Sequence, residues 1–270
     1  MGKLHISVAA EEVARLGGIK ITNSLLTGLL VLLTLIIFAF LVNSKKEKKD
    51  RGLFMIVESI IEGFYNFFEN IAQDKAEKLF PLLFTFFIYI IIGNWIGLFP
   101  GIGSIGFYEE IGHGEIFVPL FRGPNADLNT TIALALISVG ITQYLSIKTL
   151  GIKSYISRFI NLTNPIKFFV GLLELISEFA KILSFSFRLF GNIFAGEVLL
   201  AVMVFLVPVL VPVPFLILEV FVGFIQALVF TMLTTIFIVV ATEEHHEAEP
   251  RLDSEASSGA SLSASLGEGV

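Results

Sequence analysis

Long uncharged stretches alternate along the chain with short segments that hold most of the charged residues. An α-helix needs about 20 consecutive apolar residues to cross the hydrocarbon core of a bilayer. The pattern predicts an all-α membrane protein with about five membrane-embedded helices, at 21–43, 79–100, 127–148, 167–207 and 213–242.

The last two predicted helices form the most unusual part of this pattern. They meet at a proline-rich turn, 208–214, and are expected to form an antiparallel hairpin. A helix over 167–207 would be about 60 Å long, roughly twice the thickness of the hydrocarbon core. The hairpin is therefore expected to be steeply tilted or bent.

The segments around and between these helices differ in character, within a predicted membrane domain of 21–242. Residues 52–73 place Phe and Ile among Glu at helical spacing, which predicts an amphipathic helix along the cytoplasmic interface. Residues 1–20 are interpreted as a retained outer segment, because the first apolar run is too long for a cleaved signal peptide. Residues 243–270 are rich in Ser, Ala, Gly and Glu, which predicts a disordered cytoplasmic tail.

Composition agrees with a membrane protein. The 270 residues are 55% hydrophobic and 16% charged, and 28 of them are Phe, which is more apolar than a soluble domain of this size requires. The formal net charge of −6 says little about the membrane part, because much of the acid lies in the tails. The chain has no cysteine, which excludes disulfides, thiolate metal sites and thiol catalysis.

Basic residues indicate how the chain is oriented. Most lie in segments that would share one side of the membrane: 45–51, Lys75, Lys78, Lys148, Lys153, Arg158 and Lys167. The loop between the second and third spans holds only Arg122, and the turn at 208–214 holds no charge. Because cytoplasmic loops carry the excess of lysine and arginine, the N-terminus is expected outside and the C-terminal tail in the cytoplasm.

Two short motifs are better explained without a ligand. GIGSIG at 101–106 satisfies a dinucleotide-binding pattern, but it neither follows a soluble strand nor opens a strand-helix-strand unit, so a flexible turn is expected. EEHHE at 243–247 lacks the spacing of a zinc protease and is interpreted as part of a solvated tail. No metal site is predicted.

Three ionisable residues interrupt the apolar block 182–242, namely Arg188, Glu197 and Glu219. A charge at membrane depth costs at least ~2.5 kcal/mol, so such residues usually face protein or water and mark an ion path. The alternative is an Arg–Glu pair that pins two helices together. At ~100° per residue, a polar stripe shares the face of Arg188, and its members are Glu174, Ser177, Lys181, Ser184 and Asn192.

The other two charges lie away from that stripe. Glu197 is nine residues beyond Arg188 and points to the opposite side, whereas a pinning pair is expected three or four residues away. On the last helix, Glu219 and Gln226 share one face, although the Gln226 amide could instead bond to a neighbouring backbone. The hairpin would place Glu219 nearest the outer turn, then Glu197 and Gln226, then Asn192 and Arg188. We therefore expect two polar paths that meet at a fixed positive charge.

Asp127 opens the third predicted span just after Pro124. A helix N-cap is its default role. A contribution to the outer polar path is the alternative.

Four segments carry a family resemblance: RLFGNIFAGE at 188–197, FIQALVFTML at 224–233, RGPNADLNTTIALAL at 122–136 and LFPLLFTFFIYIIIGNWIGLFP at 79–100. Together they resemble subunit a of F-type ATP synthases. The likeness covers nearly the whole chain from 21 to 244, and the first segment is highly specific. There are two departures. Asn125 stands where the family usually has Thr, and Glu219 stands where many members have His and others a carboxylate.

The resemblance implies a stator subunit that conducts ions, expected to be protons, through two offset half-channels with Arg188 between them. It implies a proteolipid c-ring, the peripheral-stalk subunit b, the rest of the ATP synthase and membrane lipid as partners, without nucleic acid or a cofactor. Catalytic sites would lie on other chains. The membrane would be a bacterial-type plasma (inner) membrane. The ion-translocating residues would be Arg188, Asn192, Glu197, Glu219 and Gln226, with the stripe from Glu174 to Ser184 as the cytoplasmic half-channel.

Two other kinds of protein agree less well with the sequence. A self-contained secondary transporter would be expected to show paired repeats with broken helices around a midplane site, and the sequence has neither. A structural membrane scaffold would have no need for three charges in its last hairpin.

The orientation is testable because the chain lacks cysteine. Single cysteines that replace Lys46 and Lys153 should react with an impermeant thiol reagent only from the cytoplasm, and one at Ser104 only from outside. Labelling of position 104 from the cytoplasm would overturn the orientation derived from the basic residues.

Overall fold

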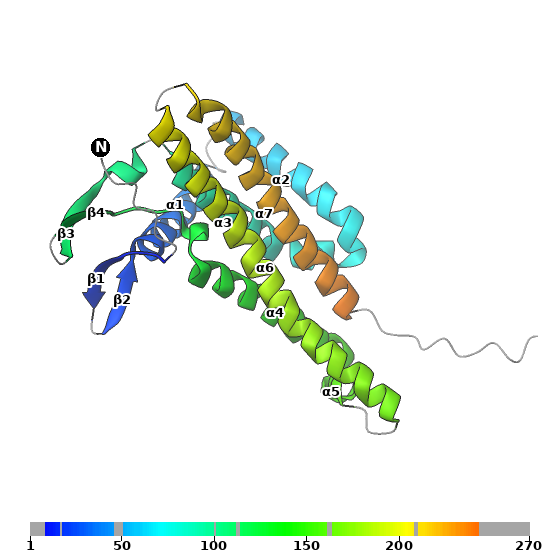
Figure 1. Ribbon diagram of the computed structural model, residues 1–270. Coiled ribbons are helices and arrows are strands. Elements are labelled where there is room, and N and C mark those ends of the chain that lie inside the picture. The colour runs from blue at the N-terminus through cyan, green and yellow to red at the C-terminus, as the bar shows by residue number, and fades with distance from the viewer. Residues whose placement is uncertain are drawn as a thin grey trace, which may run out of the picture.

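A computed structural model of the chain describes residues 9–16, 18–45, 51–99, 101–111, 114–160, 164–207 and 210–242. The predicted disordered tail, the EEHHE motif and most of the basic run at 45–51 lie outside these ranges. The topology is dominated by helices (Figure 1).

The helices begin and end within three residues of the ranges expected from the sequence. They are α1 (Asn23–Lys45), α2 (Arg51–Ala72), α3 (Ala76–Leu98), α4 (Leu128–Leu150), α6 (Pro165–Leu206) and α7 (Pro212–Thr242). A short additional helix, α5 (Ile152–Phe159), was not expected, and neither were the 3₁₀ turns η1 (Gln73–Lys75), η2 (Ile102–Ser104) and η3 (Pro124–Ala126).

Five helical segments in the described chain are long and apolar enough to cross a membrane: Asn23–Asn43, Met55–Leu98, Leu128–Leu150, Pro165–Leu206 and Pro212–Thr242. This confirms the predicted all-α membrane fold. The second segment joins α2 to α3, but it is interrupted at Gln73, which has a positive φ of 47°. α2 folds back on α3, so that Phe64 packs against Phe84 and Phe87.

Local chemistry explains several helix ends. Asp127 is the N-cap of α4, and its side chain accepts a hydrogen bond from the backbone N–H of Asn129, as predicted for this residue. α4 ends at Gly151, whose φ of 81° suits a residue without a Cβ. α6 begins with a proline, Pro165, at a position where the missing N–H has no intrahelical partner to lose.

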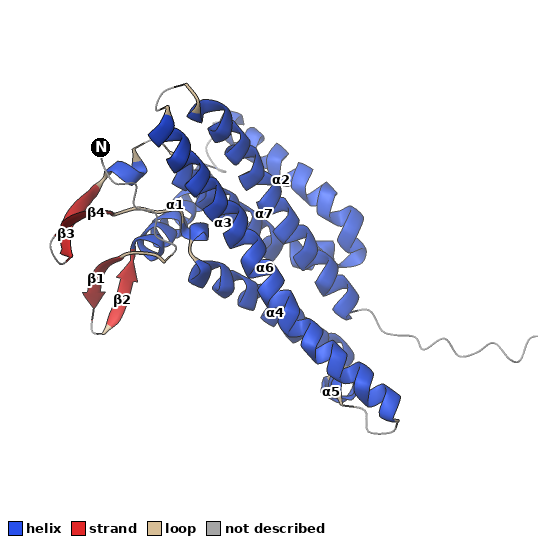
Figure 2. Ribbon diagram, viewed as in Figure 1, coloured by secondary structure: helices blue, strands red, loops and turns tan. Residues whose placement is uncertain are grey.

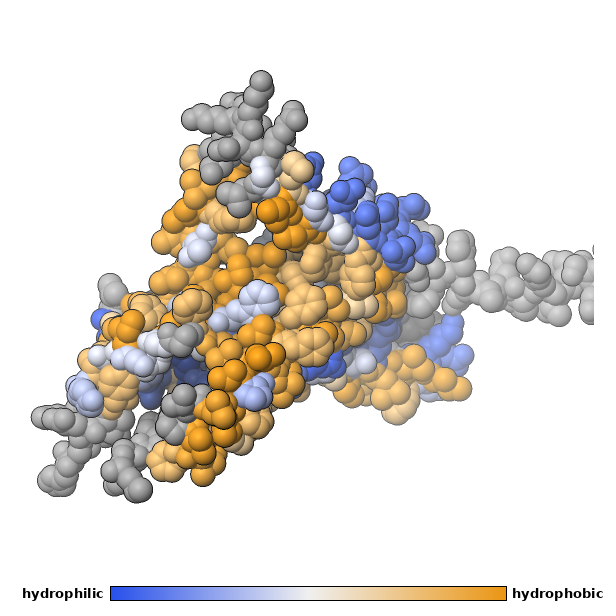
Figure 3. All heavy atoms as spheres, turned by 90° about the horizontal axis from the view of Figure 1, so that it is seen from above, coloured by the Kyte–Doolittle hydropathy of each residue, from blue (hydrophilic) through white to orange (hydrophobic). Residues whose placement is uncertain are grey.

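The core lies where α3, α4, α6 and α7 pack together. Phe230 of α7 is 1% exposed and contacts Phe86 of α3 and Phe185 of α6. Leu189, the residue after Arg188, is fully buried in the same cluster. α6 thus turns one face into the core, while many of its other large apolar side chains are exposed. Figure 3 shows a broad apolar surface on one face of the molecule, as expected for contact with lipid.

Polar groups also join the helices. Ser138 of α4 and Thr234 of α7 share a hydrogen bond of 2.8 Å, and Ser146 donates to the carbonyl of Ala241. Asn125, fully buried in η3, donates to Asn94 Oδ1 on α3 at 2.7 Å, and Asn94 donates in turn to the carbonyl of Gly223 on α7. The residue that departs from the family pattern therefore helps to hold the loop before α4 against α3.

Two antiparallel hairpins lie together at one side of the helices (Figure 2). They are β1 (Glu12–Leu16) with β2 (Ile19–Thr22), and β3 (Gly106–Ile111) with β4 (Gly114–Pro119). The hydrophobic pattern of the sequence does not predict these strands. The Asn23 amide at the start of α1 donates to the carbonyl of Pro119 at the end of β4, so the two hairpins mark one end of the bundle, here called the hairpin end. α5 marks the opposite end, here called the α5 end.

Candidate functional site

Arg188 lies on an exposed face of α6. Its guanidinium donates a hydrogen bond of 3.3 Å to Ser184 Oγ, one turn earlier. Within the described ranges it makes no ion pair, so the alternative of a helix-pinning pair with Glu197 is not formed. Because arginine stays protonated in proteins, α6 presents an uncompensated positive charge on this face.

A hollow of about 340 Å³ lies beside Arg188, on the side toward the α5 end. α6 contributes Ser177, Lys181, Ser184 and Arg188 to its lining, and α7 contributes Leu233 and Phe237. The structure therefore brings three of the four residues predicted for the cytoplasmic half-channel into one concave surface with the arginine.

Glu174, the fourth residue of that predicted set, does not line the hollow. Its carboxylate pairs with the guanidinium of Arg158 on α5. The C-terminus of α5 lies close against α6, because a Cβ at Gly171 would overlap the backbone of Phe159. Glu174 thus has a structural partner that fixes α5 to the first turns of α6.

Asn192 and Gln226 meet one turn beyond Arg188. The Asn192 amide donates to Gln226 Oε1 at 2.7 Å and links α6 to α7. Gln226 is 4% exposed, whereas Asn192 is exposed. The side-chain oxygen of Gln226 therefore accepts from another side chain and not from a backbone group.

Glu219 is buried on α7, at 6% exposure. Its carboxyl group lies against the backbone of Gly196 on α6, so closely that a Cβ on Gly196 would overlap it. Among the described residues, Glu219 Oε1 has no hydrogen-bond partner and the carboxylate makes no ion pair. Such a group is free to take up or release a proton without breaking a contact within the chain.

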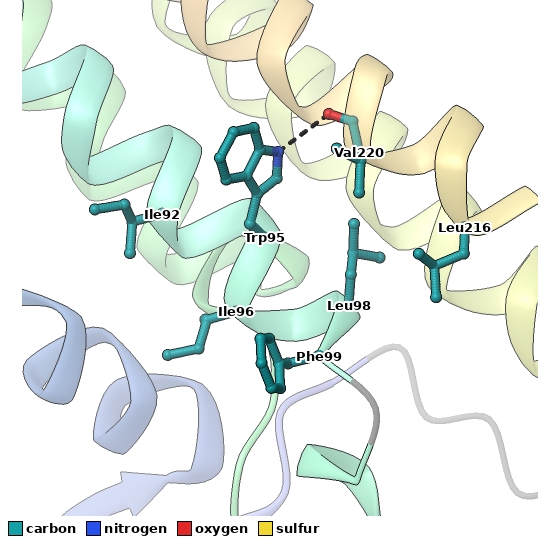
Figure 4. Close-up of a pocket in the computed structure, with 7 residues that line it drawn as sticks. All are labelled: Ile92, Trp95, Ile96, Leu98, Phe99, Leu216 and Val220. Atoms are coloured by element: carbon teal, nitrogen blue, oxygen red, sulfur yellow. Dashed lines mark hydrogen bonds between the residues drawn. The ribbon is translucent and has the colours of Figure 1, made fainter. Parts of the chain in front are cut away.

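Val220, the residue after Glu219, anchors α7 to α3. The indole of Trp95 donates to the carbonyl of Val220 at 3.1 Å, at the edge of an apolar groove of about 490 Å³ (Figure 4). Asn94, which precedes Trp95, bonds to Gly223. Two side chains of α3 therefore fix the α7 backbone just after Glu219, at Val220 and Gly223.

Glu197 has a partner that the sequence analysis did not identify. Arg122, in the loop before α4, donates from Nη2 and Nε to Glu197 Oε2 at 3.1 and 3.2 Å. The Arg122 side chain is 6% exposed and that of Glu197 is 45% exposed. Arg122 also donates to the carbonyl of Ala9 and lies 5.9 Å from the centre of the Phe194 ring. The sequence shows Arg122 as the one lysine or arginine between α3 and α4, but it does not indicate its partner.

Asp127 has both carboxylate oxygens engaged. Oδ1 accepts from the Asn129 backbone, and Oδ2 accepts from the hydroxyl of Ser24 on α1 at 2.7 Å. These contacts match the N-cap reading and leave the carboxylate in a structural position. No group of three or more His, Cys, Asp or Glu residues able to hold a metal occurs in the part of the chain that the structure describes.

The polar residues thus form two sets on either side of Arg188. Toward the hairpin end lie Asn192, Glu197, Glu219 and Gln226, and toward the α5 end lie Ser177, Lys181 and Ser184. Two carboxylates, Glu197 and Glu219, lie toward the hairpin end, and the hollow lies toward the α5 end. This arrangement can pass small cations by way of titratable or polar groups, and the fixed charge lies between the two sets.

Comparisons with known proteins all give one family. Residues 24–239 match the family model described as ATP synthase A chain. The chain is 39% identical over 194 residues to ATP synthase subunit a of Desulfotalea psychrophila, covering 70% of this chain and 71% of that protein. It is 31% identical over 240 residues to the Moorella thermoacetica subunit a, covering 88% and 99%. With the chloroplastic subunit a of Oedogonium cardiacum it shares 36% over 223 residues, covering 82% and 83%.

The different surroundings of the two glutamates predict different costs for their removal. Glu197→Leu removes a carboxylate that accepts two hydrogen bonds from the buried Arg122 guanidinium. It should lower the free energy of unfolding by about 2 kcal/mol, less than for a fully buried pair because Glu197 is half exposed. Glu219→Leu removes a carboxyl group that has no ion-pair partner among the described residues, and should leave stability unchanged or higher. Thermal unfolding of the purified chain in detergent checks this. An equal or larger loss for Glu219→Leu would contradict it.

Proposed function

Because the family model spans most of the chain, the protein belongs to the ATP synthase A chain family, and we propose that it provides two half-channels separated by Arg188. As a member it is the ion-translocating subunit of the membrane sector and not the catalytic subunit. The single observation that supports the proposal most strongly is the exposed, uncompensated charge of Arg188 on the polar face of α6.

A charge at membrane depth usually faces a water-filled cavity or pairs with an opposite charge, and within the described chain Arg188 makes no ion pair. We propose a carboxylate of the proteolipid ring as its partner, with the exposed face of α6 turned toward the ring. The guanidinium attracts each passing carboxylate and favours its ionised form. Because arginine does not release its own proton, it also separates the two half-channels.

The outer half-channel proposed here uses the residues toward the hairpin end. Glu219 is the proton carrier, since its buried carboxyl group has no ion-pair partner in the described chain. Asn192 and Gln226 lie between Glu219 and Arg188, and their hydrogen bond of 2.7 Å joins the two helices across the path. Glu197 and Arg122 stand beside this route as a paired group at its outer side.

The cytoplasmic half-channel proposed here is the hollow lined by Ser177, Lys181 and Ser184. Protons would enter from outside, load a ring carboxylate near Asn192, travel around with the ring, and leave through this hollow. Glu174 and Arg158 lie at its cytoplasmic side as a structural pair. The orientation follows the basic loops, with the hairpin end outside, the α5 end in the cytoplasm of a bacterial-type cell, and subunit b as a further neighbour.

Replacement of Arg188 tests this mechanism. Arg188→Ala should abolish ATP-driven proton pumping in membrane vesicles while the complex still assembles, because the removed group is a surface charge and not part of the core. Arg188→Lys should also fail or nearly fail, since an ammonium is more strongly hydrated and can lose its proton when desolvated. Pumping is compared after normalisation to assembled complex, and wild-type pumping in the alanine variant would refute the proposal.

The close contact of Gly196 with Glu219 gives a second test. A Cβ at position 196 would overlap the Glu219 carboxyl group, so Gly196→Ala should displace the proton carrier and slow pumping about tenfold or more, as expected when a reacting group moves by about 1 Å. The matched control is Gly140→Ala on α4, where an added Cβ meets no atom within 4 Å. Glu219→Asp, which withdraws the carboxylate by one methylene, should partly restore pumping to the Gly196→Ala variant. Normal pumping in Gly196→Ala would remove Glu219 from the path.

A further inference from the structure

One carboxylate of α6 lies behind the hollow and has no role in the function proposed above. Glu178 stands about 80° around the helix from Arg188, outside the stripe that faces the ring. Its side chain is 14% exposed. Oε1 accepts a hydrogen bond from Lys181 Nζ at 2.7 Å, and Oε2 accepts one from the amide of Gln143 on α4 at 2.6 Å.

Lys181 links Glu178 to the hollow. It is one of the residues that line the hollow together with Arg188. Its ammonium also lies 4.8 Å from the centre of the Phe237 ring on α7. The charge of Lys181 is thus held between a carboxylate of its own helix and an aromatic ring of the next, about 10 Å along the helix axis from Arg188.

The position of Glu178 is fixed from the α5 end as well. The phenol of Tyr155 on α5 donates to Gln143 Oε1 at 2.9 Å, which leaves the Gln143 amide N–H to donate to Glu178. These groups border a second cavity of about 480 Å³, whose other walls are apolar. Burial, and next the Glu178 charge, raise the pKa of Tyr155 above its ordinary value, which keeps the phenol a neutral donor. Three helices therefore contribute to holding one carboxylate.

We propose that Glu178 is a positioning residue that neutralises Lys181 at the wall of the hollow, so that Arg188 remains the one uncompensated cation there among the described residues. The inference rests on the proposed half-channel and adds a residue to it. An unpaired ammonium about 10 Å from Arg188 would oppose the passage of a proton through the hollow and would compete for the ring carboxylate. The hydrogen bonds of Gln143 and Tyr155 hold Glu178 in the geometry that prevents this.

Single and double substitutions that remove these two charges test the proposal in the intact complex. Glu178→Gln leaves Lys181 unpaired and should lower proton pumping about tenfold, from the interaction of two charges at this separation. Lys181→Gln removes the cation from the wall and gives the reference rate for a hollow without a charge at position 181. The double variant Glu178→Gln/Lys181→Gln, which has no charge at either position, should recover to the same level. Rates are measured in vesicles and normalised to assembled complex.

Glu69→Gln on the exposed face of α2 is the matched control, because it removes one negative charge at a residue that does not line the hollow. If the double variant is as slow as Glu178→Gln, Glu178 carries protons itself or serves only the packing, and the proposal is wrong. If Glu178→Gln does not assemble, Glu178→Asp decides: it keeps the charge and should pump within about threefold of wild type, and a tenfold loss contradicts the proposal. If the proposed half-channels themselves are wrong, the Arg188→Ala variant will pump as well as wild type, whatever the Glu178 variants do.

Discussion

The uncompensated charge of Arg188 in an apolar hairpin is the constraint on which the rest of the structure depends. Such a charge is costly in hydrocarbon, and the carboxylates nearest to it in sequence are engaged or turned elsewhere. Glu197 pairs with Arg122, Glu178 pairs with Lys181, and Glu219 lies behind Gly196. Within the described chain, these arrangements leave the guanidinium without a carboxylate partner. The proposed exchange with a carboxylate of another chain requires this, because a permanent internal partner would compete with it.

Packing against the core explains how α6 and α7 hold Arg188 and its neighbours in place. α6 is anchored by its opposite face, where Leu189 and Phe185 enter the core beside Phe230. α7 is fixed just after Glu219, at Val220 and Gly223, by Trp95 and Asn94 of α3. The polar face of α6 can therefore remain open without loss of position. Rigid support of this kind suits a site whose partner moves past it.

The helices and part of the site could be predicted from the sequence because both depend on local properties. Apolar run length locates the spans, cap chemistry places the start of α4 at Asp127, and the helical period groups Ser177, Ser184 and Arg188 on one face. The pairing of Arg122 with Glu197 joins residues 75 apart in sequence, and that of Gln143 with Glu178 joins residues 35 apart. These pairs depend on how helices and loops pack, which periodicity does not report. The β hairpins could not be predicted either, because short strands outside the apolar runs leave little periodic signal in the sequence.

The separation of two aqueous paths at Arg188 is tested most directly by the side from which each path is reached. In a chain without natural cysteine, Ser184→Cys and Glu219→Cys place one thiol on each side of the arginine. Silver ions, which are small enough to follow a proton path, are added to the intact complex from one side of the membrane at a time. The account predicts that position 184 reacts only from the cytoplasmic side and position 219 only from the outer side. Reaction of either thiol at equal rates from both sides would show a continuous pore and contradict the separation.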